Sequence, residues 1–263
     1  MNKKYIGIFD SGLGGLTTTK AIIEKLPNEN IVFFADKKNL PYGDKTKEEL
    51  ISCSFGNLEF LEQYDLKALV IACNTVDANV RDKVEEKAKE KVFGVIEPAA
   101  RKAALLTKNN KIGLLATEMA VKSKTYEKKV HKYNENALVY QVACPLLVPM
   151  IEKGSIVNEP EEMCKVFFSY MKPLMDEGID TLILGCTHYD LLIPLCEKEY
   201  PDLNIVSSSR EVVSDIEEYL KNEQHEENEV SRLYFVNTDP ENFVLQARSI
   251  ISDITIKKAG GSD

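Results

Sequence analysis

Two apolar runs in the chain end in the same way, with a cysteine followed by polar residues. The first covers residues 68–75, ALVIACNT, and the second covers residues 181–188, TLILGCTH. A short run rich in Val, Ile and Leu is typical of a parallel strand buried on both faces, and open α/β sheets bind ligands at the C-terminal ends of such strands. We therefore expect Cys73 and Cys186 each to lie at the C-terminal end of a strand, where a ligand can bind.

A second pair of similar segments indicates an internal duplication. Residues 5–11, YIGIFDS, and residues 111–117, KIGLLAT, are again apolar strands that end in a hydroxyl residue. Between the apolar runs lie segments with apolar positions near helical spacing, and this alternation is typical of a parallel sheet with helices on both faces. The chain is therefore predicted to be an α/β protein with two pseudo-symmetric, doubly wound parallel-sheet domains and an active site in the cleft between them.

The predicted boundaries follow from the same patterns. Pro98 is expected to mark a crossing between the halves, because the residue before a proline avoids the helical region and proline ends pairing in a sheet. With a second crossing near residue 207, one domain is predicted over residues 1–97 plus 208–263 and the other over 98–207. Residues 221–231 are expected to form a polar surface loop, and the tail from residue 257 is expected to be frayed. The predicted strands are 5–9, 31–35, 68–72, 92–96, 112–116, 138–142, 181–185, 203–206 and 233–236, and the predicted helical segments are 16–26, 47–64, 77–91 and 122–133.

Composition and charge narrow the class of protein. The 263 residues are 44% hydrophobic, which is enough to bury one large core or two smaller ones. The formal net charge is −9, whereas nucleic-acid-binding domains are usually basic, so no nucleic-acid partner is expected. The chain has no apolar window of the length of a membrane span and no apolar signal-peptide region at its N-terminus. We expect a cytoplasmic protein without a membrane partner.

Cysteine usage does not indicate disulfides or a metal site. The wide spacing of the cysteines is not a disulfide framework, and cytosolic thiols stay reduced. No CxxC pair is present, and no further Cys/His pair lies at zinc-ligand spacing from Cys186 and His188, so no metal is expected. For any single cysteine the alternative interpretation is a small buried apolar side chain. The six cysteines are Cys53, Cys73, Cys144, Cys164, Cys186 and Cys196.

Two turns follow predicted strands. Residues 10–16, DSGLGGL, lead into a helix, and glycines there let backbone amides approach an anion at the helix N-terminus. The alternative is a tight turn in which Asp10 or Ser11 caps the helix. Residues 40–44, LPYGD, follow the second strand and by themselves are typical of an ordinary β-turn.

The two strand-end cysteines together indicate proton chemistry. If Cys73 and Cys186 face each other across the cleft, each can approach one face of a small bound molecule. Inverting a carbon that carries an amino and a carboxylate group needs a base on one face and an acid on the other, which a thiolate and a thiol supply. His188 and Asp10 are the available proton-handling neighbours.

Six sequence blocks occur in order along the chain. They are DSGLGG (10–15), PYG (41–43), CNT (73–75), GVIEP (94–98), CPLLVP (144–149) and GCTHY (185–189). Together they resemble the signature blocks of the glutamate racemases, in the cofactor-independent aspartate/glutamate racemase superfamily. The resemblance extends from about residue 5 to residue 245.

The resemblance implies interconversion of L- and D-glutamate as the small-molecule substrate, without pyridoxal phosphate, metal or other cofactor, to supply D-glutamate for peptidoglycan. In that family the cysteine matching Cys73 deprotonates the D isomer and the one matching Cys186 deprotonates the L isomer. Asp10 and His188 match the groups that assist these thiols, and Glu152 is a further candidate. A homodimer is also implied. The implied substrate-binding residues are Asp10, Ser11, Pro41, Tyr42, Gly43, Asn74, Thr75, Thr117, Thr187 and His188.

The chain departs from the family pattern at four positions near these blocks. Ala120 stands where a second threonine is usual, and Ser207 stands where an aspartate is usual. Asp77 and Asp190 replace a common serine and a common proline beside the two cysteine blocks. Two alternatives therefore stay open: a racemase for aspartate or another acidic amino acid, and a non-catalytic amino-acid-binding or regulatory paralogue.

Overall fold

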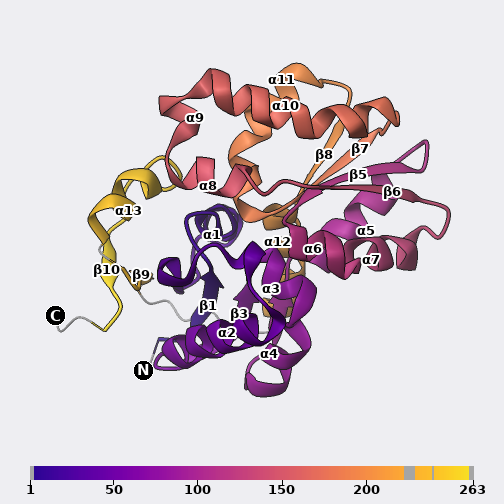
Figure 1. Cartoon of the computed structure of the whole chain (residues 1–263). Helices are drawn as coiled ribbons and strands as arrows, with labels where there is room; N and C mark the ends of the chain where they lie inside the picture. Colours follow the sequence, from indigo (N-terminus) through magenta and orange to yellow (C-terminus); the bar gives the residue numbers. More distant parts are fainter. Residues whose placement is uncertain (1–2, 222–228, 239, 261–263) are drawn as a thin grey trace.

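The computed structural model describes residues 3–221, 229–238 and 240–260. Its strands form two separate sheets in which every strand pair is parallel (Figure 1). The first sheet has the order β10 (Ile256–Lys258), β9 (Arg232–Val236), β2 (Ile31–Ala35), β1 (Tyr5–Asp10), β3 (Leu66–Ile71) and β4 (Val92–Gly94). The second has the order β6 (Leu138–Ala143), β5 (Lys111–Ala116), β7 (Thr181–Gly185) and β8 (Asn204–Ser207).

The strand order reveals the internal duplication. The succession β2-β1-β3-β4 in the first sheet is matched by β6-β5-β7-β8 in the second, so in each the first strand along the chain lies between the second and the third. Ile8 of β1 pairs with Val70 of β3, as Leu114 of β5 pairs with Ile183 of β7. The predicted fold class, two parallel-sheet α/β domains, is confirmed.

Helices connect the strands and cover the sheets. The α-helices are α1 (Gly15–Lys25), α2 (Lys47–Leu61), α3 (Asn74–Asn79), α4 (Arg81–Lys87), α5 (Ile96–Leu106), α6 (Glu118–Ser123), α7 (Thr125–Tyr133), α8 (Leu147–Glu152), α9 (Ser155–Asn158), α10 (Pro160–Asp176), α11 (Ile193–Glu199), α12 (Ser208–Leu220) and α13 (Pro240–Ala247). The 3₁₀ turns are η1 (Lys37–Asn39), η2 (Tyr42–Asp44) and η3 (Thr187–Leu192). Because β-strand side chains alternate, Ile8 packs in the core on one face of the first sheet while Phe9 packs in the core on the other.

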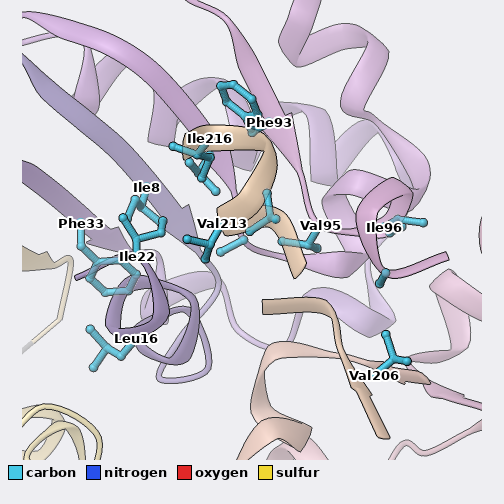
Figure 2. Packing of buried hydrophobic residues seen from close by; sticks show 14 of the residues in the cluster. Ile8, Leu16, Ile22, Phe33, Phe93, Val95, Ile96, Val206, Val213 and Ile216 are labelled. Atoms are coloured by element: carbon cyan, nitrogen blue, oxygen red, sulfur yellow. The ribbon is translucent and has the colours of Figure 1, made fainter. Parts of the chain in front are cut away.

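One hydrophobic core runs from the first sheet into the second. Figure 2 shows Ile8 and Phe33 of the first sheet in the same cluster as Val206 of the second, with Val213 and Ile216 of α12 among them. Helix α12 contacts both α1 and α5, so it packs against helices that belong to different halves. The apolar contacts of α12 therefore hold the two sheets together.

Several local predictions were wrong. Glu97 is helical, because Pro98 lies in the first turn of α5, where its missing N–H breaks no helical hydrogen bond. The chain therefore passes from β4 to the second sheet through a helix, and the predicted strand 92–96 ends at Gly94. The predicted helix 77–91 begins earlier, at Asn74, and is divided into α3 and α4 at Val80.

The end of the chain is more ordered than expected. Residues 256–258 form β10, which pairs with β9 and places Lys258 opposite Val236. This pairing is the reason that the start of the expected frayed tail is a strand. Residues 222–228 of the predicted loop and residues 261–263 of the predicted tail lie outside the described residues. The domain boundaries at residues 97/98 and 207/208 stay a prediction, and within the described ranges no helix is long and apolar enough to cross a membrane.

Candidate active site

A cavity of about 40 Å³ lies where the C-terminal ends of strands from both sheets meet. Among the residues predicted for the site, Glu152 is the one that does not line this cavity. The predicted residues that do are Asp10, Ser11, Pro41, Tyr42, Gly43, Cys73, Asn74, Thr75, Thr117, Cys186, Thr187 and His188. The sequence prediction missed Asp44, Glu118, Cys144, Pro145, Val148 and Pro149 as lining residues. Cys144 directly follows β6, so the strand-end rule that selected the other two cysteines could have found it.

The first thiol, that of Cys73, lies between β3 and α3 and is buried. Burial raises the pKa of the Cys73 thiol well above its usual value, and the negative charge of Asp10 raises it further. Backbone N–H groups of Val76 and Thr75, at the start of α3, partly oppose this rise by stabilising the thiolate. Cys73 is therefore held as a thiol until a positive charge or a base comes near.

Asp10, at the end of β1, is a titratable group beside Cys73. Burial raises the pKa of its carboxyl group above the usual 3.8, while the positive charge of His188 opposes the rise. Its Oδ2 accepts a hydrogen bond of 3.0 Å from Thr187 Oγ1, whereas its buried Oδ1 has no hydrogen-bond partner among the described residues. A carboxyl group with one unused oxygen in a cavity can exchange a proton there.

The second thiol, that of Cys186, has an imidazole as its neighbour. Cys186 follows β7 and begins η3, and its Sγ lies 3.8 Å from His188 Nδ1. The other ring nitrogen, His188 Nε2, lies 2.6 Å from Glu152 Oε1. Burial lowers the pKa of His188, but contact with Cys186 and Glu152 outweighs burial and raises it well above the usual value. Glu152 thus acts on the cavity through His188.

Glu152 is buried but charged. Burial by itself would raise its pKa, yet the hydrogen bond and charge of His188, the charge of Lys37 and the N–H of Leu13 lower it to about 2. The Leu13 N–H donates to Oε1 over 2.8 Å. A permanently ionised carboxylate on Nε2 favours the protonated imidazole, so His188 can hold a proton next to Cys186.

One glycine of the DSGLGG turn allows a close contact between the two halves, and the predicted approach of the turn's amides to an anion stays a prediction. A Cβ on Gly14 would lie 2.3 Å from Thr187 Oγ1 and 2.6 Å from His188 Nδ1. The missing side chain therefore lets the turn of the first half lie directly against the turn of the second half that follows Cys186. Gly14 occupies the N-cap position of α1 without a side-chain hydrogen bond, so neither Asp10 nor Ser11 caps that helix.

Hydroxyl and amide groups surround the rest of the cavity. Thr75 Oγ1 and Thr117 Oγ1 lie 3.0 Å apart and join the two halves. Asn74 is held from both sides, because its Nδ2 donates to Ser208 Oγ and its Oδ1 accepts from the hydroxyl of Tyr126. These bonds fix the polar groups that a ligand would meet.

The hydroxyl of Tyr42, a residue that lines the cavity, is engaged by other side chains of the first half. The hydroxyl donates to Asp36 Oδ2 over 2.5 Å and accepts from Asn57 Nδ2 over 3.0 Å, both within the first half. Gly43 lies against Thr117, since a Cβ on Gly43 would lie 3.2 Å from Thr117 Cβ. The PYG segment thus lines the cavity and packs against Thr117 of the second half.

The four departures from the family pattern lie behind the cavity surface. Ala120 is fully buried and does not line the cavity. Asp77 Oδ2 accepts from the Ile96 N–H over 2.7 Å and so ties α3 to the start of α5. Asp190 Oδ2 accepts from Ser207 Oγ over 2.7 Å, which ties η3 to the end of β8. These substitutions anchor the two cysteine-bearing turns to neighbouring elements.

The arrangement offers proton donors and acceptors and little that would bind a metal. Within the described ranges, no group of three or more His, Cys, Asp and Glu side chains is arranged to hold a metal ion. The lining residues that remain can abstract, hold and return protons at two separate thiols.

Comparisons with known proteins agree with this arrangement. The family model described as Asp/Glu/Hydantoin racemase matches residues 6–216. The chain is 40% identical to a glutamate racemase of Neisseria meningitidis over 97% of its own length and 90% of that protein. It is also similar in structure to a glutamate racemase isoform of Bacillus anthracis, with a TM-score of 0.91, 35% identity and coverage of 98% of both chains. A glutamate racemase of Francisella tularensis, solved in complex with D-glutamate, matches with a TM-score of 0.86 and 31% identity over 98% of this chain and 97% of that one. Because the family model and these relatives cover most of its length, the chain belongs to the Asp/Glu/Hydantoin racemase family.

Proposed function

We propose that the protein is a glutamate racemase that interconverts L- and D-glutamate by two-base proton transfer at Cα. The observation that carries the proposal is the pair of thiols, Cys73 and Cys186, which line one cavity from equivalent strand ends of the two sheets. Each thiol has its own proton-handling neighbour, Asp10 for the first and His188 for the second. The similarity to glutamate racemases selects glutamate as the substrate.

In the proposed reaction, one sulfur takes the proton from Cα and the other delivers a proton to the opposite face. Cys73 deprotonates the D isomer and Cys186 deprotonates the L isomer. The electron pair of the broken C–H bond stays on the substrate, delocalised into the α-carboxylate, until the second thiol protonates Cα. The thiol that gave its proton is left as a thiolate and is ready for the reverse direction.

The substrate itself helps to ionise the first thiol. Burial and the charge of Asp10 keep Cys73 protonated in the free protein. The ammonium group of a bound amino acid brings a positive charge into the same cavity, and an opposite charge within a few ångströms favours a thiolate. Asp10 and His188 then accept or return the proton that each thiol exchanges.

Neutral donors are proposed to hold the two substrate carboxylates. Among the described residues, no lysine or arginine lines the cavity. The hydroxyls of Ser11, Thr75, Thr117 and Thr187, with backbone N–H groups of the PYG segment, are the available donors. Hydrogen bonds to an ionised acceptor are about twice as strong as neutral ones, so several such donors can replace a buried cation.

The wider role follows from the same proposal. D-glutamate made by this chain would supply peptidoglycan synthesis in the cytoplasm, and we propose that the protein works as a homodimer. Size-exclusion chromatography with light scattering measures the oligomeric state, and a monomer at enzyme concentrations used for assay would contradict the dimer.

The proposed function is tested by following optical activity and exchange together. Purified protein is incubated in D₂O with L- or D-glutamate, and with L- or D-aspartate in parallel, without added cofactor. We expect the circular dichroism signal of glutamate to decay from both directions with deuterium at Cα. Turnover of aspartate alone would assign the chain to aspartate racemisation, and binding without exchange would favour a non-catalytic amino-acid-binding role.

A further inference from the structure

An ion pair joins the two halves of the molecule beside the candidate site. Lys37 begins η1, just after β2 of the first sheet, and its Nζ lies 3.2 Å from Oε2 of Glu152 at the end of α8. The Glu152 side chain is only 6% exposed and that of Lys37 is 24% exposed. An ion pair shielded to this degree is screened less by solvent and salt than a surface pair.

The two oxygens of Glu152 have different partners. Oε1 is shared between the Leu13 N–H at 2.8 Å and His188 Nε2 at 2.6 Å. Oε2 is buried and accepts no hydrogen bond from any described residue, so the ammonium group of Lys37 is the charged contact that holds it. Without Lys37, Oε1 would still have its hydrogen-bond partners, but Oε2 would lose the contact that holds it in place.

The C-terminal segment supports the same arrangement. Helix α13 lies beside α8 and α9 (Figure 1), and Gln246 of α13 donates from Nε2 to the backbone oxygen of Glu152 over 2.8 Å. The Lys37 Nζ lies 5.2 Å from the ring centroid of Phe243, also on α13. The aromatic ring and the carboxylate together determine where the ammonium group can lie.

We propose that Lys37 is a positioning residue for the proposed racemisation: by holding Glu152 Oε2 across the cleft, it keeps Oε1 on His188 and the imidazole directed at Cys186. This inference rests on the proposed function, because it assigns Lys37 to the half of the reaction that Cys186 performs. Lys37 does not line the cavity and therefore acts through Glu152 and His188.

The charges around the pair set the direction of the expected change. Lys37 and His188 face Glu152, while Asp10 and Cys186 act on His188 from the other side. Removing the Lys37 charge should raise the pKa of Glu152, and it loosens the Oε1–His188 hydrogen bond that raises the pKa of His188, so the pKa of His188 should fall. The freed carboxylate can also rotate, which misplaces the imidazole relative to the Cys186 sulfur.

The first test reads His188 directly and does not depend on turnover. Histidine ring signals are titrated by NMR in the ligand-free protein, which has only three histidines, and His188→Asn assigns the relevant signal. Lys37→Met keeps an apolar stem beside Phe243 and should move the His188 titration to lower pH, because the Glu152–His188 contact that raises its pKa is loosened. Lys37→Arg should restore the wild-type curve, and Lys38→Met, a change at the exposed neighbouring lysine, is the matched control.

The second test measures the proposed reaction. Lys37→Met should lower kcat about tenfold to a hundredfold, the scale of loss when a catalytic group is misplaced by an ångström, with KM for glutamate changed less than about twofold. Lys37→Gln is the second variant if the methionine variant is unstable. A His188 titration in both variants that overlays the wild type would overturn the inference, whereas an inactive wild-type protein would overturn the proposed function and leave the titration result valid.

Discussion

The two thiols occupy equivalent places in the duplicated fold but have different helpers. Cys73 follows the third strand of the first sheet and Cys186 follows the third strand of the second. In the first half the proposed acid–base group is Asp10, at the end of the first strand, and in the second half it is His188, two residues after the thiol. The two thiols therefore lie at equivalent positions of the two halves, whereas their titratable neighbours do not.

The equivalent positions show how the helpers were distributed. Ala116 ends β5 at the place where Asp10 ends β1, and Thr75 follows Cys73 at the place where His188 follows Cys186. A carboxyl group and an imidazole differ in charge when protonated, so the two thiols meet opposite electrostatic conditions. The negative charge of Asp10 raises the pKa of Cys73, whereas Glu152 keeps His188 positively charged beside Cys186.

Removing either thiol should have the largest effect. In the proposed mechanism Cys73→Ala and Cys186→Ala each leave one face of Cα without an acid–base group, so racemisation should fall by at least about 10³-fold. Circular dichroism of L- and D-glutamate measures the loss. Cys144→Ala is the matched control, because this third thiol lines the same cavity and its Sγ lies 3.5 Å from the Val142 carbonyl oxygen.

Cys144→Ala should keep activity within about tenfold of wild type. Retained racemisation in Cys73→Ala or Cys186→Ala would contradict the two-thiol mechanism. Equal losses of activity in all three cysteine variants would mean that the cavity tolerates no loss of side-chain volume. The result would then not distinguish Cys73 and Cys186 from Cys144.

Changing the helpers should separate the two halves of the reaction. His188→Asn slows proton transfer at Cys186, and Asp10→Asn slows it at Cys73, each by about 10²-fold. With His188→Asn the primary isotope effect should increase for α-deuterated L-glutamate, because removal of its deuteron becomes limiting, and decrease for α-deuterated D-glutamate. Asp10→Asn should give the reverse pattern. The isotope effects on kcat/KM measured from both isomers check this.

Isotope effects that change in the same direction for both isomers would show that the helpers do not serve separate thiols. The ratio of kcat/KM for the two isomers is not informative here, because the reaction equilibrium fixes it. A variant that lowers kcat/KM equally for L- and D-glutamate is therefore compatible with the proposal. Only the isotope effects distinguish proton transfer at Cys73 from proton transfer at Cys186.

The two halves can also be compared in how a buried carboxyl group behind each thiol affects the stability of the fold. These groups are Asp77 in the first half and Asp190 in the second. Asp77 is bonded to the Ile96 N–H and lies 3.5 Å from Arg81, so both of its oxygens have partners. Asp190 is bonded to Ser207 through Oδ2, but its buried Oδ1 has no hydrogen-bond partner among the described residues. Burial raises the pKa of Asp190 to about 6, although the Ser207 hydroxyl opposes the rise. Burial also raises the pKa of Asp77, so both carboxyl groups are costly to ionise in the folded state, and Asp190 has in addition one oxygen without a hydrogen bond from the described residues.

Asp190→Asn should change how stability depends on pH. An acid whose pKa is raised on folding stabilises the folded state while it is protonated, and this contribution is lost as pH rises from about 4 through 6. The wild type should lose about 2–3 kcal/mol from this group over that range, and Asp190→Asn should not. Urea denaturation at pH 4.5, 6 and 7.5 measures the difference between the two proteins.

Ser207→Ala is the companion variant, because it removes the hydroxyl that stabilises the Asp190 carboxylate. Its destabilisation relative to wild type should grow as pH rises from 4.5 to 7.5. A difference between Asp190→Asn and wild type that is the same at every pH would contradict a raised pKa at this residue.

The smallest effect is expected at Ala120. This residue is buried in the core and away from the cavity surface, and its N–H lies at the Thr117 hydroxyl that caps α6. Ala120→Ser should therefore change KM for L- and D-glutamate less than about threefold, at a stability cost of about 1–3 kcal/mol for the added atom in a packed core. A large gain in glutamate affinity would show instead that a hydroxyl at this position reaches the substrate.

The fold and most of the cavity residues could be predicted from the sequence, because both predictions depend on locating the apolar strands. Apolar strands and the residues that follow them are local signals, and the carboxyl ends of parallel strands meet at one edge of a sheet. Asp10, Cys73 and Cys186 could be placed in this way. The contacts of the turn residues were harder to predict, because no local pattern in the DSGLGG block indicates that Gly14 lies against Thr187 and His188.

What the sequence by itself determined is the duplicated α/β architecture and the two strand-end thiols, since both depend on short patterns repeated along the chain. Only the tertiary structure decided how the site is held together. Leu13 and Glu152 are 139 residues apart in the chain, and Lys37 and α13 reach Glu152 from still other segments. Such contacts depend on how two separately formed sheets pack against α12, and no local pattern encodes that packing.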